Sequence, residues 1–178
     1  MSNKIDILIS KEQLENRIIE LGKRIKEDYQ GKELVCVGLL KGSVVFISDL
    51  IRAIDMDLSI DFMKVSSYGK GTDSTGVVKI LKDVDEEVTG KDVLLVEDIV
   101  DTGLTIANVK EFMAKKRPNS VKVCTLLDKP SRRKIDVKAE YVGFEIPDEF
   151  VIGFGLDYAE KYRNLSYVGK LTLDKENK

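Results

Sequence analysis

The segment VLLVEDIVDTGLT, Val93 to Thr105, gives the clearest indication of the fold. Its first four residues are a continuous apolar run, typical of a strand that is buried on both faces of a sheet. Three carboxylates follow within five residues, and a hydroxyl- and glycine-rich stretch then opens a helix. The segment therefore predicts a strand, an acidic loop and a helix start.

The rest of the chain repeats this alternation of strands and helices. Helices are predicted at Lys11 to Tyr29, where Ser10 and Gln13 form a capping box, at Ser43 to about Ile54, and after Thr105 with Ile106, Val109, Phe112 and Met113 facing inward. Strands are predicted at Leu34 to Leu40, around Ile60 to Val65, at Val77 to Leu81, Val93 to Val96, Val121 to Leu127 and Tyr141 to Phe144, and near Val151 and Tyr167 to Leu173. This order favours one α/β domain, residues 1–178, with a mostly parallel twisted sheet flanked by helices.

Composition narrows the possible functions. Of 178 residues, 43% are hydrophobic and 34% charged, with a net charge of −2, so a nucleic-acid or membrane-surface partner is not expected. No histidine occurs, which excludes Ser-His-Asp and Cys-His nucleophiles and makes a zinc site hard to build. Cys36 and Cys124 lie in apolar runs and are interpreted as buried thiols. With a polar N-terminus and no membrane-spanning stretch, they favour a cytoplasmic protein.

The acidic loop combines a helix start that favours an anion with carboxylates that favour a cation or hydrogen-bond donors. A helix that begins with glycine and hydroxyls offers free N–H groups and a positive dipole end, which favour a phosphate. Glu97, Asp98 and Asp101 repel one another unless a cation or a donor-rich ligand lies between them. A ribose 5-phosphate satisfies both demands. The alternative is a solvated acidic turn with an ordinary helix cap.

The full string resembles the phosphoribosyl-pyrophosphate signature of type I phosphoribosyltransferases. The similarity runs from about Ile7 to Leu171 and is close to hypoxanthine–guanine phosphoribosyltransferases. It rests on GLLKGS (38–43), VEDIVDTGLT (96–105), LLDKPSRR (126–133) and VGFEIPDEFVIGFGLDYAEKYRNL (142–165). It implies a small hood formed by N- and C-terminal segments, with purine-binding residues at about 145–173. It also implies a mobile lid at about 66–76, the glycine-rich stretch SSYGKGTDSTG.

The resemblance implies a reaction and its residues. The 5-phosphoribosyl group of 5-phospho-α-D-ribose 1-diphosphate would be transferred to N9 of hypoxanthine or guanine. The products would be IMP or GMP and pyrophosphate, as in purine salvage. Asp101 would be the proton-transfer group near N7 of the purine. The phosphoribosyl site would comprise Glu97, Asp98, Thr102, Gly103, Leu104 and Thr105. The pyrophosphate site would comprise Leu40, Lys41, Gly42 and Arg163, with a Leu-Lys peptide that can be cis in the family. The purine site would comprise Lys129, Phe150, Val151 and Asp157; the lid pair would be Ser67 and Tyr68; Mg²⁺ would be held by Glu97, Asp98 and Asp157.

Several alternatives remain open at the level of sequence. Lys129 could be a solvated cation beside Arg132 and Arg133, Phe150 could be a core residue, and Lys41 could lie in an ordinary turn. Other candidate functions are a xanthine- or uracil-preferring phosphoribosyltransferase and a catalytically silent, nucleotide-sensing regulator. The resemblance also implies a homo-oligomer, either a dimer or a tetramer.

Overall fold

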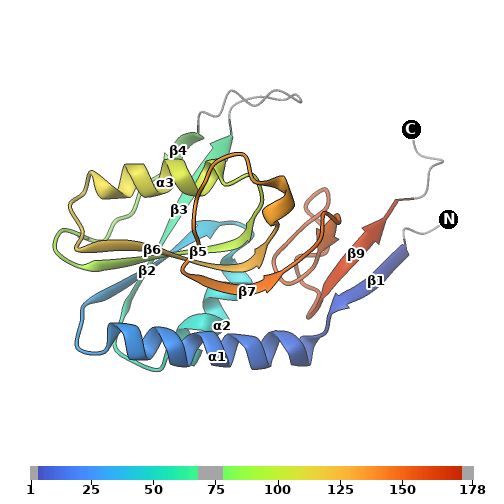
Figure 1. The fold of residues 1–178 in the computed structure, drawn as a ribbon, viewed down its shortest axis with the longest axis horizontal. Coiled ribbons are helices and arrows are strands. Elements are labelled where there is room, and N and C mark those ends of the chain that lie inside the picture. Colours follow the sequence, from blue (N-terminus) through green and yellow to red (C-terminus); the bar gives the residue numbers. More distant parts are fainter. Residues whose placement is uncertain (1–3, 68–77, 174–178) are drawn as a thin grey trace.

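The computed structural model describes residues 4–67 and 78–173, arranged as a six-stranded sheet with helices on both faces and a separate three-stranded sheet (Figure 1). The strand order of the large sheet is β4-β3-β2-β5-β6-β7, with β4 antiparallel and the other strands parallel. The bounds are Leu34–Leu40 (β2), Ser59–Ser67 (β3), Val78–Lys82 (β4), Asp92–Val100 (β5), Ser120–Asp128 (β6) and Tyr141–Glu145 (β7). The α/β fold with a mostly parallel sheet is confirmed.

Three helices cover the large sheet. The helices α1 (Lys11–Tyr29) and α2 (Val44–Ile54) pack on one face, and α3 (Leu104–Ala114) packs on the other (Figure 1). The predicted capping box of α1 is present, since Ser10 Oγ accepts from Gln13 N at 3.2 Å and Gln13 Oε1 accepts from Ser10 N at 2.8 Å. The apolar side chains Leu14 and Ile18 of α1 are buried at the helical spacing that predicted this element.

The second sheet forms the hood, which we define as β1 (Lys4–Ile9), β8 (Val151–Ile152) and β9 (Val168–Thr172). Its order is β1-β9-β8, and both neighbouring pairs are antiparallel. Figure 1 shows it beside the C-terminal end of β7, with both ends of the described chain in it. The strand β1 was not predicted, because KIDILI has one fully buried residue and acquires its order from pairing with β9.

Two predicted strand ends are wrong. Strand β5 does not stop at Val96 but continues to Val100, because Ile99 and Val100 pair with Leu127 and Asp128 of β6. The predicted loop does not begin at residue 66, since β3 runs to Ser67 and pairs there with β4. Most of the predicted lid, including Tyr68, lies outside the described residues.

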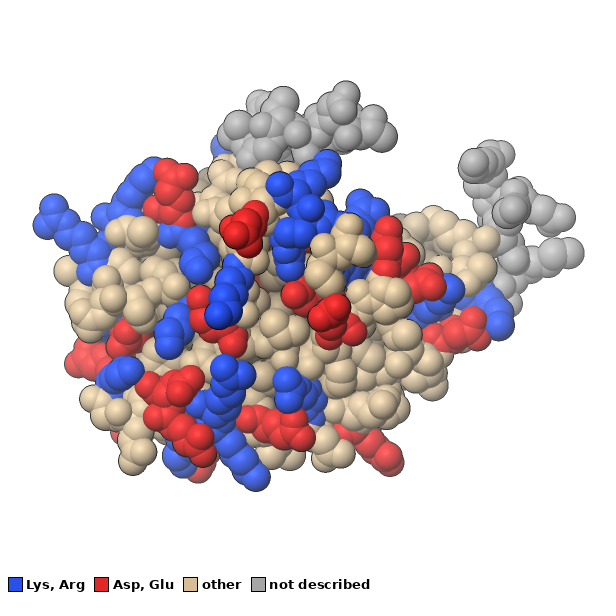
Figure 2. Space-filling view, viewed as in Figure 1, with Lys and Arg blue, Asp and Glu red and all other residues tan. Residues whose placement is uncertain are grey.

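Charged side chains of both signs are interspersed over the face seen in Figure 2, with no wide area of a single sign. This face gives no support to a polyanion-binding regulator, which needs a broad basic surface. Within the described ranges, no helix is long and apolar enough to span a membrane.

Candidate active site

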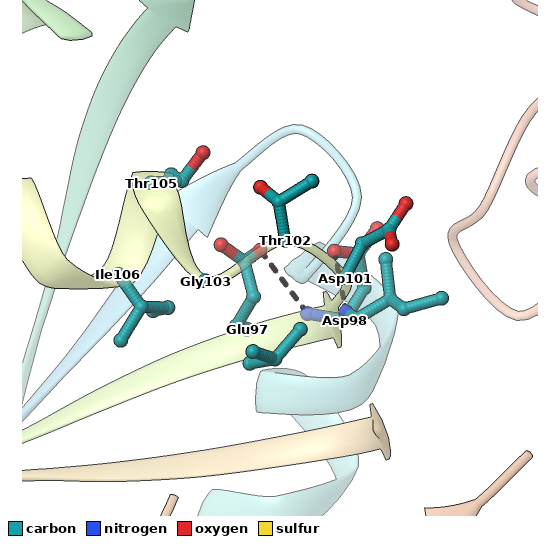
Figure 3. A pocket seen from close by; sticks show the side chains of 9 residues that line it. Glu97, Asp98, Asp101, Thr102, Gly103, Thr105 and Ile106 are labelled. Carbon is teal, nitrogen blue, oxygen red and sulfur yellow. Dashed lines mark hydrogen bonds between the residues drawn. The ribbon is translucent and has the colours of Figure 1, made fainter. Parts of the chain in front are cut away.

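A pocket of about 230 Å³ lies at the C-terminal end of β5, and all of its lining residues fall between 97 and 106 (Figure 3). In open α/β sheets ligands bind beyond the carboxyl ends of the strands, and this pocket has that position. Figure 3 shows Thr105 in the first turn of α3 and Thr102 in the loop just before it, with Asp98 and Asp101 nearer the end of β5. Carboxylates and the start of a helix thus line one pocket within one short segment.

Gly103 shapes the anion end of the pocket. It caps α3 with φ +86°, and a Cβ there would lie 2.7 Å from Val137 Cγ1, so both conformation and space require glycine. Gly103 offers no side chain to the helix N–H groups, and the Thr102 hydroxyl accepts from Leu104 N at 3.4 Å. The N-terminal end of α3 therefore presents backbone donors and a positive dipole end toward the pocket.

Glu97, which is buried, and Asp98, which is partly buried, form an adjacent acidic pair in β5. Burial raises the pKa of Glu97 well above its ordinary value, and the neighbouring Asp98 charge raises it further. Burial likewise raises the pKa of Asp98. Asp98 N donates to Glu97 Oε1 at 3.2 Å, and Ile99 N donates to Asp98 Oδ1 at 2.8 Å. The pair therefore favours a shared proton, a cation or a ligand rich in hydroxyl donors.

The loop between β2 and α2 presses against this pair. The Leu40–Lys41 peptide bond is cis, as the resemblance allowed. A Cβ on Gly42 would lie only 1.7 Å from Asp98 Oδ2, so the backbone of the loop touches the carboxylate. Ser43 is fully buried and donates to Leu39 O at 2.7 Å, which fixes the loop at the start of α2.

A loop from the C-terminal part of the chain completes this side of the site. Gly155 has φ +102°, and a Cβ there would lie 2.1 Å from Gly42 O. Arg163 Nη1 donates to Gly155 O at 2.8 Å, and its Nη2 lies 2.9 Å from Asp157 Oδ1. Close backbone packing of two glycines thus brings Arg163 beside the β2–α2 loop.

Two cations meet in this region. Lys41 Nζ lies 2.9 Å from Glu160 Oε2, and Arg163 Nη2 lies 3.4 Å from Glu160 Oε1. The hydrogen bond from Lys41 lowers the pKa of Glu160. Lys41 and Arg163 are far apart in sequence, but one carboxylate bridges them, so they can engage one anionic group together.

The end of β6 carries a buried ammonium group. Lys129 is 8% exposed, its Nζ donates to Glu149 O at 2.6 Å, and its N–H donates to Val100 O at 2.9 Å. Phe150 is half exposed, with the Tyr158 ring edge-on at 5.7 Å between centroids. Lys129 Nζ is thus bound to the residue that precedes Phe150, and a buried donor together with a half-exposed ring suits a flat heterocycle with a carbonyl oxygen.

A family model described as the phosphoribosyl transferase domain matches residues 6–159. The chain belongs to the phosphoribosyltransferase family.

Individual relatives match over nearly the whole chain. A hypoxanthine-guanine phosphoribosyltransferase of Staphylococcus aureus (strain Mu50) is 55% identical over 166 residues, which cover 93% of each chain. A hypoxanthine phosphoribosyltransferase of Salmonella typhimurium (strain LT2) is 52% identical over 175 residues, covering 97% of this chain and 98% of that one. A crystal structure of a Bacillus anthracis hypoxanthine-guanine phosphoribosyltransferase, with a HEPES molecule in its active site, superposes with a TM-score of 0.92 at 53% identity, covering 96% of this chain and 100% of that chain.

Most of the predicted site residues of this phosphoribosyltransferase lie at the C-terminal ends of β2, β5 and β6 and in the adjoining hood. Leu104 begins α3, and Val151 is buried in β8 where it pairs with Lys170. Ser67 ends β3, while Tyr68 lies outside the described residues. Asp157 is held by Arg163, and within residues 4–67 and 78–173 no three His, Cys, Asp or Glu side chains form a metal cluster. The three predicted Mg²⁺ ligands are therefore not preassembled in one cage.

Sequence reasoning missed three residues of this region: Gly155, Glu160 and Arg132. The spacing GFG, with φ of +92° at Gly153 and +102° at Gly155, was a usable signal for a tight backbone approach. Nothing in the sequence distinguished Glu160 or Arg132 from solvated surface charges. Glu160 contacts Lys41 and Arg132 contacts Asp101, so each joins segments that only the tertiary fold brings together.

Proposed function

We propose that this phosphoribosyltransferase transfers the 5-phosphoribosyl group of 5-phospho-α-D-ribose 1-diphosphate to N9 of hypoxanthine or guanine, producing IMP or GMP and pyrophosphate for purine salvage. The observation that carries the proposal is the buried Lys129 ammonium, which is bound to the backbone of Glu149 next to the half-exposed Phe150, after the strand that neighbours the acidic pocket. The similarity over nearly the whole chain to hypoxanthine-guanine and hypoxanthine phosphoribosyltransferases supports the same choice of base.

The purine is selected at its 6-position. Lys129 is a donor, so it pairs with a 6-oxo group, whereas adenine would place an amino donor against it. Phe150 stacks on the ring, a contact of about 1–3 kcal/mol per base in stacking sites. Val151 contributes its backbone, because its side chain is buried in the hood.

The sugar phosphate occupies the pocket after β5. Thr102, Gly103, Leu104 and Thr105 surround the 5-phosphate at the start of α3, where backbone donors are concentrated. Glu97 and Asp98 accept from the ribose hydroxyls and favour positive charge on the ribose ring as the bond to pyrophosphate breaks. Asp101 lies near N7 of the purine and takes or shares its proton.

The leaving pyrophosphate lies against the β2–α2 loop, where Leu40, Lys41 and Gly42 face it together with Arg163. The donor set fits Mg²⁺, since Glu97 and Asp98 are adjacent carboxylates that a cation can stabilise, and Mg²⁺ takes one or two carboxylates plus substrate oxygens. Glu97, Asp98 and Asp157 would hold it, and it would neutralise charge on the pyrophosphate. The cations of Lys41 and Arg163 serve the same leaving group from the protein side.

Further properties remain predictions. Closure of residues 66–76, with Ser67 and Tyr68, would exclude water from the activated ribose. The free, buried cysteines Cys36 and Cys124 suit a reducing compartment such as the cytoplasm. A homo-oligomer, dimeric or tetrameric, is expected and can be measured by sedimentation.

The test follows pyrophosphate release from the activated ribose with hypoxanthine, guanine, xanthine, adenine and uracil in turn, with and without Mg²⁺. Turnover with hypoxanthine or guanine, dependent on Mg²⁺ and absent with adenine, is expected. Asp101→Asn should lower kcat by about 10²- to 10⁴-fold with substrate binding retained, the range for a lost proton-transfer group. A preference for xanthine or uracil, or ligand binding without turnover, would replace the proposal with one of its alternatives.

A further inference from the structure

Arg132 lies between two groups that the proposed function assigns to the purine. Its Nε is 3.0 Å from Asp101 Oδ1, and its Nη1 is 3.5 Å from Asp148 Oδ2. The other oxygen of Asp148 lies 3.9 Å from Lys129 Nζ. A chain of alternating charges therefore joins Asp101, after β5, to Lys129, after β6.

The two carboxylate oxygens of Asp101 have different surroundings, because Oδ1 lies next to Arg132 Nε. Oδ1 is fully buried and accepts no hydrogen bond of good geometry, although the Arg132 guanidinium lies beside it. The side chain as a whole is nevertheless 38% exposed. The exposed part consequently includes Oδ2, which is the oxygen left for a ligand.

The backbone around Asp101 is held by the same segment. Arg133 Nη1 donates to Asp101 O at 2.9 Å, and its Nη2 pairs with Asp128. Lys134 N donates to Thr102 O at 2.9 Å. With the main chain fixed in this way, the Arg132 guanidinium, which is the ion-pair partner of Asp101 within residues 4–67 and 78–173, can set the orientation of the Asp101 carboxylate.

A 6-oxopurine presents O6 and N7 as neighbours on one edge of the ring. If Lys129 meets O6, the group that meets N7 must hold a fixed position relative to Lys129, because proton transfer needs heavy atoms about 2.6–3.2 Å apart. Arg132 is suited to set this position, since its planar guanidinium can contact Asp101 and Asp148 at once, whereas a lysine offers a single nitrogen.

We propose that Arg132 is a positioning residue for base recognition: it holds Asp101 Oδ1 so that Oδ2 faces N7 of the purine, and through Asp148 it keeps that oxygen in register with Lys129. This inference rests on the proposed function and adds a residue to it. Arg132 itself does not touch the reacting atoms.

The first experiment compares Arg132→Gln and Arg132→Lys with the wild-type protein in steady-state turnover of hypoxanthine. We expect Arg132→Gln to lower kcat by about 10- to 10²-fold, the loss typical of a misplaced catalytic group, with KM for the activated ribose within about twofold. Arg132→Lys should recover only part of this loss. Lys134→Gln is the matched control, because Lys134 is exposed, comes from the same segment, and makes no side-chain hydrogen bond or ion pair within the described part of the chain.

The second experiment places Arg132→Gln in an Asp101→Asn background. If Arg132 acts through Asp101, the double variant should be no slower than Asp101→Asn alone, because interacting residues give non-additive losses. Additive losses, wild-type kcat in Arg132→Gln, or an equal loss in Lys134→Gln would overturn the inference. Unchanged turnover in Asp101→Asn alone, or no turnover of 6-oxopurines by the wild-type protein, would instead contradict the proposed function.

Discussion

Replacement of Gly42 by alanine is the most direct test of how the site is assembled. An added Cβ would lie 1.7 Å from Asp98 Oδ2, whereas ordinary contacts of this kind begin at 3.4 Å. Asp98 cannot rotate away freely, because its Oδ1 accepts from Ile99 N at 2.8 Å in a partly buried position. Either the loop or the carboxylate must therefore move by more than about 1 Å, a displacement of the size that can cost about 10²-fold in rate.

The same overlap should lower stability. Overpacking of this kind typically costs about 1–3 kcal/mol. For a chain of 178 residues this corresponds to a fall in Tm of roughly 2–12 °C. The measurements are Tm from thermal unfolding and kcat from pyrophosphate release, both for Gly42→Ala.

Gly31→Ala provides the matched control. Gly31 has φ +77° in the turn after α1, with open space around an added Cβ, and lies outside the candidate site. Left-handed backbone in alanine costs about 1–2 kcal/mol, so its Tm should fall by a comparable amount while kcat stays unchanged. If Gly42→Ala turned over hypoxanthine at the wild-type rate, the close contact between the loop and Asp98 would have no part in catalysis. Equal rate losses in both variants would attribute the effect to stability alone.

Three other substitutions test single charges of the site. Lys129→Met should lower kcat/KM for hypoxanthine by about 10- to 10²-fold, the cost of a lost hydrogen bond to a charged group, while the Kd for the activated ribose stays within about twofold. Equal losses in kcat/KM and in ribose affinity would show that Lys129 only stabilises the fold. Glu97→Gln should raise Tm in Mg²⁺-free buffer, because the raised pKa of Glu97 in the folded state makes the free energy of unfolding fall as the pH rises from about 4.5 through that raised pKa. The gain in Tm should therefore be present at pH 8 and absent below pH ~4. A gain in Tm at low pH would contradict this explanation. Glu160→Gln should tighten pyrophosphate binding by about two- to fivefold in calorimetry, because an exposed carboxylate no longer competes for Lys41; weaker binding would instead make Glu160 part of the anion site.

The amino-acid sequence by itself determined the larger part of the fold. The capping box at Ser10 and the helical spacing after it predicted α1, and the apolar run Leu34 to Leu40 predicted β2. These signals are local, since they depend on hydrogen bonds within one turn or on burial along one strand. The acidic loop before α3 was also predicted, because its carboxylates and the start of the helix lie next to each other in the sequence.

Only the tertiary structure decided how separate segments share one site. Strand β5 continues past its apolar run because β6 offers backbone partners to Ile99 and Val100. Gly42, Gly155 and Asp98 lie far apart in the sequence, and no local pattern predicts that they come within contact distance after folding. The Arg132 contact with Asp101 likewise spans two loops. Pairing, packing and charge contacts between distant segments depend on three-dimensional proximity, which local sequence patterns do not encode.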